Sequence, residues 1–173
     1  MNLRALAVAL PLLPLLAAAA PATSPTATAT LRDAQGATVG TATLAEADGG
    51  VRVRVSVKGV SPGLHGLHLH AVGKCEGPDF KSAGPHLNPA GKEHGLDNPK
   101  GSHAGDMPNL EVGADGTGSG EFLARGATLG GGPGSLFPEG GTSLVLHAAP
   151  DDMRSDPAGN AGARIACGVV ERR

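Results

Sequence analysis

Residues 51–58 of this chain, Val-Arg-Val-Arg-Val-Ser-Val-Lys, decide its fold class. Valine occupies every second position, and arginine, serine or lysine occupies the positions between. Because successive side chains of a β-strand point to opposite faces, this run has one apolar face and one polar face. Such a strand packs one face on a core and exposes the other to water, which is typical of antiparallel sheets.

The pattern of short apolar runs and turns continues on both sides of this segment. The chain contains 28 glycines and 14 prolines, which separate the apolar runs, and no segment shows helical periodicity. We expect strands at residues 27–32, 37–45, 51–57, 65–70, 110–113, 119–124, 142–148 and 163–170. About eight short strands without helices predict an all-β sandwich or barrel.

The composition excludes some classes of function. A chain of 173 residues corresponds to one domain, or one domain with a tail. Its net charge of −2, with only 17% charged residues, argues against an electrostatic nucleic-acid binder. The absence of tryptophan and tyrosine, with only three phenylalanines, nearly excludes a surface on which bases or sugars stack.

The N-terminal segment has the features of a secretory leader. Arg4 precedes an uncharged apolar run over residues 5–20, and Ala20-Pro21-Ala22 resembles a cleavage site. The run is short for a membrane span and contains two prolines, although a membrane anchor is the alternative. We therefore expect a signal peptide over 1–22, a single mature domain over 23–173, and export to the periplasm or beyond.

The chain has two cysteines, Cys75 and Cys167, and both lie in the expected mature domain. In an oxidising compartment a lone pair of cysteines predicts one disulfide, which here would close a long loop. The alternative is two free buried thiols.

All seven histidines lie between residues 65 and 147. His68 and His70 sit two positions apart on a predicted strand, so their rings share one face, and His65 lies on the other. His147 ends another predicted strand. The long Gly- and Pro-rich stretch over residues 71–109 adds three histidines and an aspartate, the ligand set of a closed tetrahedral zinc site: His86, His94, His103 and Asp106. The alternative for this stretch is a solvated loop.

Four sequence motifs together resemble the copper/zinc superoxide dismutases, in their exported bacterial-type branch. They are GLHGLHLH at 63–70, SAGPHLNP at 82–89, HAGD at 103–106 and GNAGARIACGV at 159–169. The resemblance extends from about residue 27 to residue 170. It implies a Greek-key, immunoglobulin-like β-sandwich or barrel with long metal-binding and electrostatic loops. It also implies one copper and one zinc per chain, and conversion of superoxide to dioxygen and hydrogen peroxide.

The resemblance also implies a role for each site residue. Copper would be bound by His68, His70, His86 and His147, and zinc by His86, His94, His103 and Asp106. His86 would bridge the two metals and take part in proton transfer. Asp151 would accept hydrogen bonds from one histidine of each set, and His65 would bind backbone groups. Arg164 would attract the superoxide anion, and Cys75–Cys167 would hold the loop to the last strand.

The expected partner is superoxide, with no nucleic acid, no membrane after processing, and a homodimer as the assembled form. Two other functions fit the ligand types less well. A metal-binding or metallochaperone module without turnover would lack some ligands or Arg164, but all of them are present. An exported zinc hydrolase would need an open zinc position, but four side chains fill that site.

Overall fold

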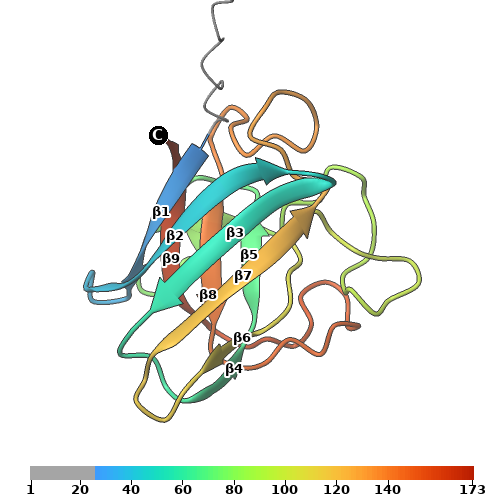
Figure 1. Cartoon of the computed structure of the whole chain (residues 1–173). Helices are drawn as coiled ribbons and strands as arrows, with labels where there is room; N and C mark the ends of the chain where they lie inside the picture. The colour runs from blue at the N-terminus through green and yellow to red at the C-terminus, as the bar shows by residue number, and fades with distance from the viewer. Residues whose placement is uncertain (1–25) are drawn as a thin grey trace, which may run out of the picture.

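The computed structural model describes residues 26–173, and the predicted leader over residues 1–22 lies outside them. The described chain is a single antiparallel sheet in the strand order β4-β6-β7-β3-β2-β1-β9-β8-β5 (Figure 1). Its strands are β1 Thr26–Asp33, β2 Thr38–Ala47, β3 Gly50–Val57, β4 Gly63–His65, β5 Leu67–His70, β6 Leu110–Val112, β7 Gly118–Arg125, β8 Ser143–His147 and β9 Arg164–Arg172. A 3-10 turn, η1 Lys81–Ala83, is the one helical element of this part of the chain. The all-β prediction is confirmed, with nine strands instead of about eight.

Within residues 26–173, no helix is both long and apolar enough to cross a membrane.

The sheet closes on itself at Gly66. The sequence predicted one strand over 65–70, but the structure contains two, and β4 and β5 lie at opposite ends of the sheet. Gly66 joins them, donating its N–H to the carbonyl of Ala149 and accepting from the N–H of His147, both at 2.9 Å. A Cβ on Gly66 would lie 2.8 Å from the Cβ of Ala161, so a larger residue could not pass here. The result is a nearly closed barrel.

This strand break corrects the expected position of His65. His65 belongs to β4 and pairs with Leu110 of β6, whereas His68 and His70 belong to β5 and pair with β8. The apolar–polar alternation changes phase at Gly66, with leucine at residue 64 before it and at residues 67 and 69 after it. This change alone does not show that the hydrogen-bonding partner changes there.

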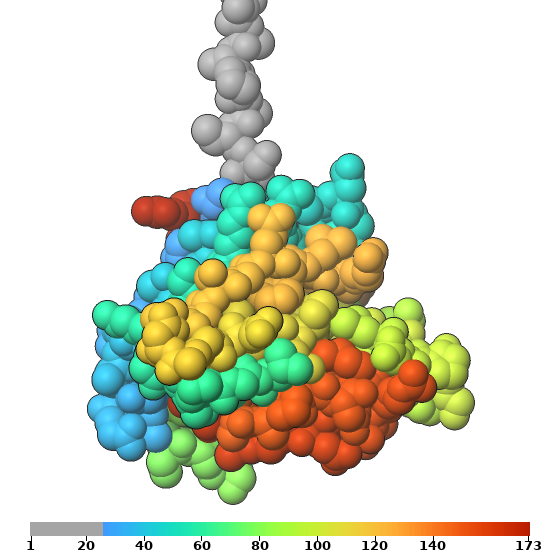
Figure 2. Space-filling view, turned by 60° about the horizontal axis from the view of Figure 1, so that its bottom comes forward, coloured from blue at the N-terminus to red at the C-terminus, as the bar shows by residue number. Residues whose placement is uncertain are grey.

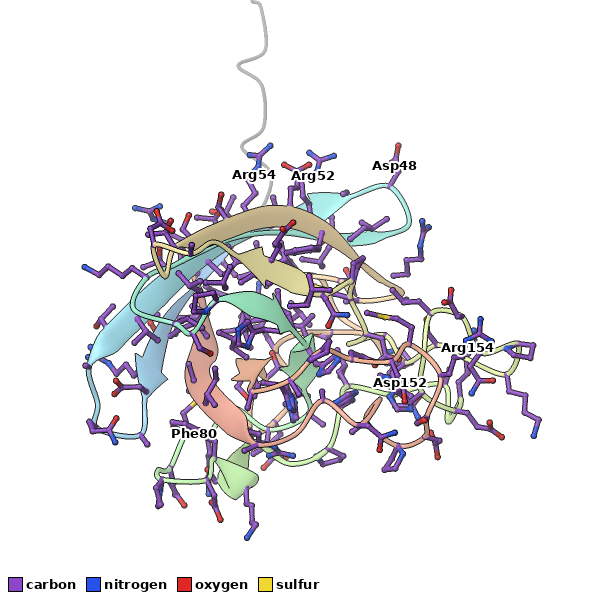
Figure 3. All side chains as sticks on the ribbon, turned by 90° about the horizontal axis from the view of Figure 1, so that it is seen from below. Asp48, Arg52, Arg54, Phe80, Asp152 and Arg154 are labelled. Carbon is purple, nitrogen blue, oxygen red and sulfur yellow. A yellow bond between two sulfur atoms is a disulfide. The ribbon has the colours of Figure 1, made fainter. Side chains whose placement is uncertain are left out.

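The valines of β3 form part of an aliphatic core. Val51, Val53, Val55 and Val57 are each at most 5% exposed. Arg52 and Arg54 project from the outer face of the barrel (Figure 3), where both contact Glu121 of β7. Leucines from other strands complete the core, including Leu31, Leu44, Leu67, Leu69, Leu110, Leu144 and Leu146. The alternation predicted for residues 51–57 is therefore present in the structure.

A long loop over residues 71–109 lies along the open edge of β5. The backbone of Leu69 accepts from the N–H of Leu87 and donates to the carbonyl of Gly105, both at 2.9 Å, and Gly105 donates to Leu87 at the same distance. A Cβ on Gly105 would lie 2.2 Å from the carbonyl oxygen of Leu69, so this approach requires glycine. These contacts pair His70 with His86 and His68 with Asp106.

The loop over residues 148–163 packs against this first loop around residues 94–97. Figure 2 shows the two side by side, in orange-red and yellow-green. Their contact includes a hydrogen bond from the N–H of Asp97 to the carbonyl of Met153, at 3.0 Å. A Cβ on Gly95 would lie 2.2 Å from the same carbonyl oxygen, so the two backbones touch.

A disulfide joins Cys75, near the start of the long loop, to Cys167 of β9. The pair packs against Phe80, Ala83 and Val145 in a small apolar cluster separate from the main core. The predicted disulfide is thus present, and it fixes the segment that leads to η1.

Replacing both cysteines, Cys75→Ser with Cys167→Ser, should destabilise the protein because the unfolded chain gains the freedom of a 92-residue loop. In the chain-entropy model the expected loss is about 4–5 kcal/mol of unfolding free energy. Urea unfolding of the metal-free proteins measures it, and reduction of the unchanged protein should produce the same shift. An unchanged unfolding midpoint would show that the cross-link does not constrain the chain.

Candidate metal centre

Four buried histidine nitrogens converge at the end of β5. The Nδ1 of His68 and the Nε2 atoms of His70, His86 and His147 are buried, and among the described residues none has a hydrogen-bond partner. These four side chains offer ligand atoms that all lie within 4.8 Å of one another. Buried polar atoms are nearly always paired, so four unpaired nitrogens facing each other fit a metal ion.

The fold explains this convergence. His68 and His70 alternate with buried leucines on β5, so their rings share a face. His147 follows an irregularity in the pairing of β8 with β9, between Leu146 and His147, and such irregularities re-aim side chains. His86 is brought in by its bridge to His70. The predicted set of four copper histidines is thus assembled from three separate segments.

A second cluster lies beside the first. The Oδ1 of Asp106 is 3.0 Å from the Nδ1 of His86, 3.0 Å from the Nδ1 of His94 and 3.4 Å from the Nδ1 of His103. The Nδ1 atoms of His103 and His86 are also 3.4 Å apart. A tetrahedral zinc site with Zn–N bonds of about 2.0–2.1 Å has edges of about 3.3–3.4 Å. The cluster therefore has the size and ligand set of a zinc site.

His86 belongs to both clusters. Its Nδ1 faces the second cluster and its Nε2 faces the first. A single imidazole ring thus connects the two groups through its two nitrogens.

The outer nitrogens of these rings all have hydrogen-bond acceptors. His70 Nδ1 donates to the carbonyl of Gly84 at 2.9 Å, and His147 Nδ1 donates to the carbonyl of Gly162 at 3.3 Å. His103 Nε2 donates to the carbonyl of Lys92 at 3.1 Å. Each acceptor holds the ring proton on the outer nitrogen, so the inner nitrogen presents its lone pair to the cluster.

Asp151 connects the two clusters from outside. Its carboxylate accepts from His68 Nε2 at 2.7 Å and from His94 Nε2 at 3.0–3.1 Å. The side chain of Asn109 fixes this aspartate, since it accepts from the Asp151 N–H at 2.8 Å and donates to the Asp151 carbonyl at 2.9 Å. Sequence analysis did not find Asn109, and a lone asparagine in a loop carries no signal of such a role.

The other two predicted site residues also contact backbone groups. His65 is buried, with its Nδ1 2.7 Å from the carbonyl of His147 and its Nε2 2.8 Å from the carbonyl of Ser61. Arg164 opens β9 and donates to the carbonyls of Phe80 and Gly84, both at 2.7 Å. The Gly84 carbonyl therefore accepts from both Arg164 and His70, which places the guanidinium next to the first cluster.

Comparison with known proteins agrees with this geometry. The family model for copper/zinc superoxide dismutase matches residues 38–170. The chain belongs to the copper/zinc superoxide dismutase family. A superoxide dismutase [Cu-Zn] of Aquifex aeolicus is 49% identical over 82% of this chain and 84% of its own length. The corresponding protein of Caulobacter vibrioides is 43% identical over 84% and 85%.

Solved structures show the same similarity. A SOD-like protein from Bacillus subtilis superimposes with a TM-score of 0.79 and 40% identity, over 82% of this chain and 96% of that one. A Cu/Zn superoxide dismutase from Brucella abortus gives a TM-score of 0.66 and 32% identity, over 84% and 99%. This superoxide dismutase therefore uses copper and zinc, and its substrate is the superoxide anion.

The electrostatics of the dismutase centre suit metal binding. Burial lowers the pKa of His70 to about 2 and that of His147 to about 3, and neighbouring histidine rings add to both effects. Burial also lowers the pKa of His86 to about 4, despite its hydrogen bond with Asp106. These rings are therefore neutral at neutral pH, the form in which histidine binds metals.

For the two buried carboxylates, hydrogen bonds outweigh the effect of burial on the pKa. Burial alone would raise the pKa of Asp106 and of Asp151, but hydrogen bonds from the histidine rings hold both well below the usual range. Burial would likewise lower the pKa of His94, but its bonds to Asp106 and Asp151 raise it to about 9. In the metal-free protein, His94 is therefore protonated between two carboxylates.

The metal-free dismutase should be most stable at about pH 6–7. Below about pH 6.5, unfolded His70, His86 and His147 take up protons that the folded protein refuses. Acidification therefore removes up to about 1.4 kcal/mol of stability per pH unit for each ring. Above about pH 6.5, folded His94 keeps a proton that the unfolded chain loses, so stability falls again toward pH 9.

Urea unfolding of the metal-free, disulfide-bonded protein between pH 4 and pH 9 measures this profile. A stability that is flat across this range would contradict the assigned pKa shifts.

Proposed function

We propose that copper is held by His68 through Nδ1 and by His70, His86 and His147 through Nε2. We propose that zinc is held by the Nδ1 atoms of His86, His94 and His103 together with Asp106. The single observation that carries the assignment is the set of four unpaired buried nitrogens beside a tetrahedron of the size zinc requires. Copper, when bound, supplies the one-electron oxidation and reduction, while zinc supplies a fixed charge.

His86 is the proposed proton carrier of the reaction. Two superoxide anions and two protons yield one dioxygen and one hydrogen peroxide, so the site must deliver protons. The Nε2 of His86 faces the copper cluster and has no other partner among the described residues. Its Nδ1 stays fixed in the zinc cluster beside Asp106. The ring can thus accept and release a proton at Nε2 without changing its position.

Arg164 is proposed to attract and orient the anion. Its guanidinium lines a hollow of about 490 Å³, together with Pro78, Asp79, Lys81, Gly162 and Ala163. Two of its donors are already used by backbone carbonyls, which fixes its position. A permanent positive charge at this place favours superoxide over neutral molecules.

We propose that residues 1–22 direct export to the periplasm and are then removed, leaving residues 23–173 as the mature enzyme. The apolar run with its small-residue cleavage site supports this, and so does the disulfide, which persists in oxidising compartments. A homodimer stays a prediction.

The variant His86→Ala tests the shared ligand. It should keep copper on three histidines, lose zinc affinity by at least about tenfold, and lose activity by about 10²-fold or more because proton transfer fails. With paramagnetic cobalt in the zinc cluster, the copper signal of the unchanged protein should be coupled through the ring, and that of the variant should not. Full activity with an unchanged coupled spectrum would disprove the bridge.

Charge at Arg164 should control the rate with superoxide. At low ionic strength we expect Arg164→Gln to be slower by about 10-fold, and Arg164→Glu to be slower still, because attraction becomes repulsion. Added salt should slow the unchanged enzyme and accelerate the Glu variant. The Gln variant retains a donor for Gly84, so it separates charge from anchoring.

Arg154→Glu is the matched control. Arg154 lies on the exposed loop over 148–163, away from the barrel (Figure 3), and its change in charge is the same. Equal losses of rate in the Arg154→Glu and Arg164→Glu variants would show that only the net charge of the protein matters. That result would contradict the proposed role of Arg164.

A further inference from the structure

A second hollow, also of about 490 Å³, opens at the zinc cluster. The rings of His86 and His103 form part of its wall, together with Asn88, Lys92, Asp156 and five prolines. Two of these prolines come from the loop over residues 71–109, two from the loop over residues 126–142 between β7 and β8, and one from the loop over residues 148–163. The wall is therefore built where these three long loops meet. This hollow shares no lining residue with the one that contains Arg164.

His103 is the zinc-cluster residue with the weakest outer anchor. It is 6% exposed, whereas His94 is fully buried and Asp106 is 1% exposed. The outer nitrogen of His94 donates to the buried carboxylate of Asp151, but that of His103 donates only to the backbone carbonyl of Lys92. A hydrogen bond to a neutral carbonyl is weaker than one to a carboxylate, so His103 can leave the cluster most easily.

One side chain holds that carbonyl in place. The amide of Asn88 donates to the carbonyl of Lys92 at 2.7 Å and accepts from the N–H of Lys92 at 3.0 Å. Asn88 itself lines the hollow. The acceptor for His103 therefore depends on a turn that a single asparagine closes.

Two opposite charges lie along the hollow. The Oδ1 of Asp156 is 3.9 Å from His103 Nε2 and accepts from the backbone N–H of His94 at 2.6 Å, while its side chain is half exposed. Lys92 is exposed on the same wall. A divalent cation in this hollow is attracted by the carboxylate of Asp156 and repelled by the ammonium group of Lys92.

We propose that this hollow is the path by which zinc enters and leaves its cluster. His103 is the ligand that swings out, Asp156 draws the cation in, and Asn88 keeps the path closed. The inference rests on the proposed assignment of zinc to His86, His94, His103 and Asp106. The substrate and the zinc ion therefore reach the centre by separate routes. The superoxide anion passes Arg164, and the zinc cation passes Asp156.

The rate at which copper-loaded, zinc-depleted protein takes up zinc tests the roles of Asp156 and Lys92. Competition with a zinc-sensitive dye measures this rate. Asp156→Asn keeps the acceptor for His94 but removes the charge, and should slow uptake by about 2- to 10-fold at low ionic strength. Lys92→Gln should accelerate uptake, and both differences should shrink at high salt. Asp97 is an exposed carboxylate of the loop over residues 71–109 that does not line the hollow, so Asp97→Asn should leave the rate unchanged.

The rate of zinc release to excess chelator tests whether Asn88 keeps the path closed. Asn88→Ala should release zinc about 2- to 10-fold faster, the effect of losing one or two hydrogen bonds. Asn160→Gly is the control, because Asn160 donates to the exposed carboxylate of Asp152, which belongs to neither the zinc cluster nor the hollow, and glycine tolerates its positive φ.

The outcomes separate this proposal from the one on which it rests. Uptake rates unchanged in both charge variants, or release equally accelerated in both asparagine variants, would overturn the path while zinc still binds in a 1:1 ratio. A protein that binds no zinc at this cluster, shown by unaltered zinc content after Asp106→Ala, would overturn the assignment itself.

Discussion

Three backbone hydrogen bonds among Leu69, Leu87 and Gly105 carry the architecture of the metal centre. They hold two distant parts of a 39-residue loop against the edge of β5, at 2.9 Å each. Since His86 precedes Leu87 and Asp106 follows Gly105, this contact places both beside the histidines of β5. A glycine-rich loop buries too little apolar surface to hold itself, so the strand edge, the disulfide and the metals together fix it.

The centre is also an electrostatic unit. Burial keeps the rings of His70, His86 and His147 neutral, while the carboxylates of Asp106 and Asp151 stay ionised because histidine rings hydrogen-bond to them. The two carboxylates and the neutral rings attract cations, and zinc displaces the proton that His94 holds in the metal-free protein. The carboxylates thus orient the histidine rings, and the metals complete the charge of the site.

The three long loops form two separate hollows, one suited to an anion and the other to a cation. One hollow presents Arg164, held by the carbonyls of Phe80 and Gly84, and the other presents Asp156 beside His103. Both depend on the loop over 71–109, which provides a wall to each. A disulfide at one end of this loop and the turn of Asn88 near its middle thus control different parts of the same centre.

The sequence by itself determined the all-β class, through the alternating valines of residues 51–57, and the family, through four ordered motifs. Both signals are local, because strand alternation and motif spacing are properties of consecutive residues. Only the tertiary structure decided the strand break at Gly66, the strand that holds His65, and the partners of each ring nitrogen, such as Asn109 behind Asp151. These depend on contacts between segments far apart in the chain, and a pattern of apolar and polar residues does not specify which backbone lies against which.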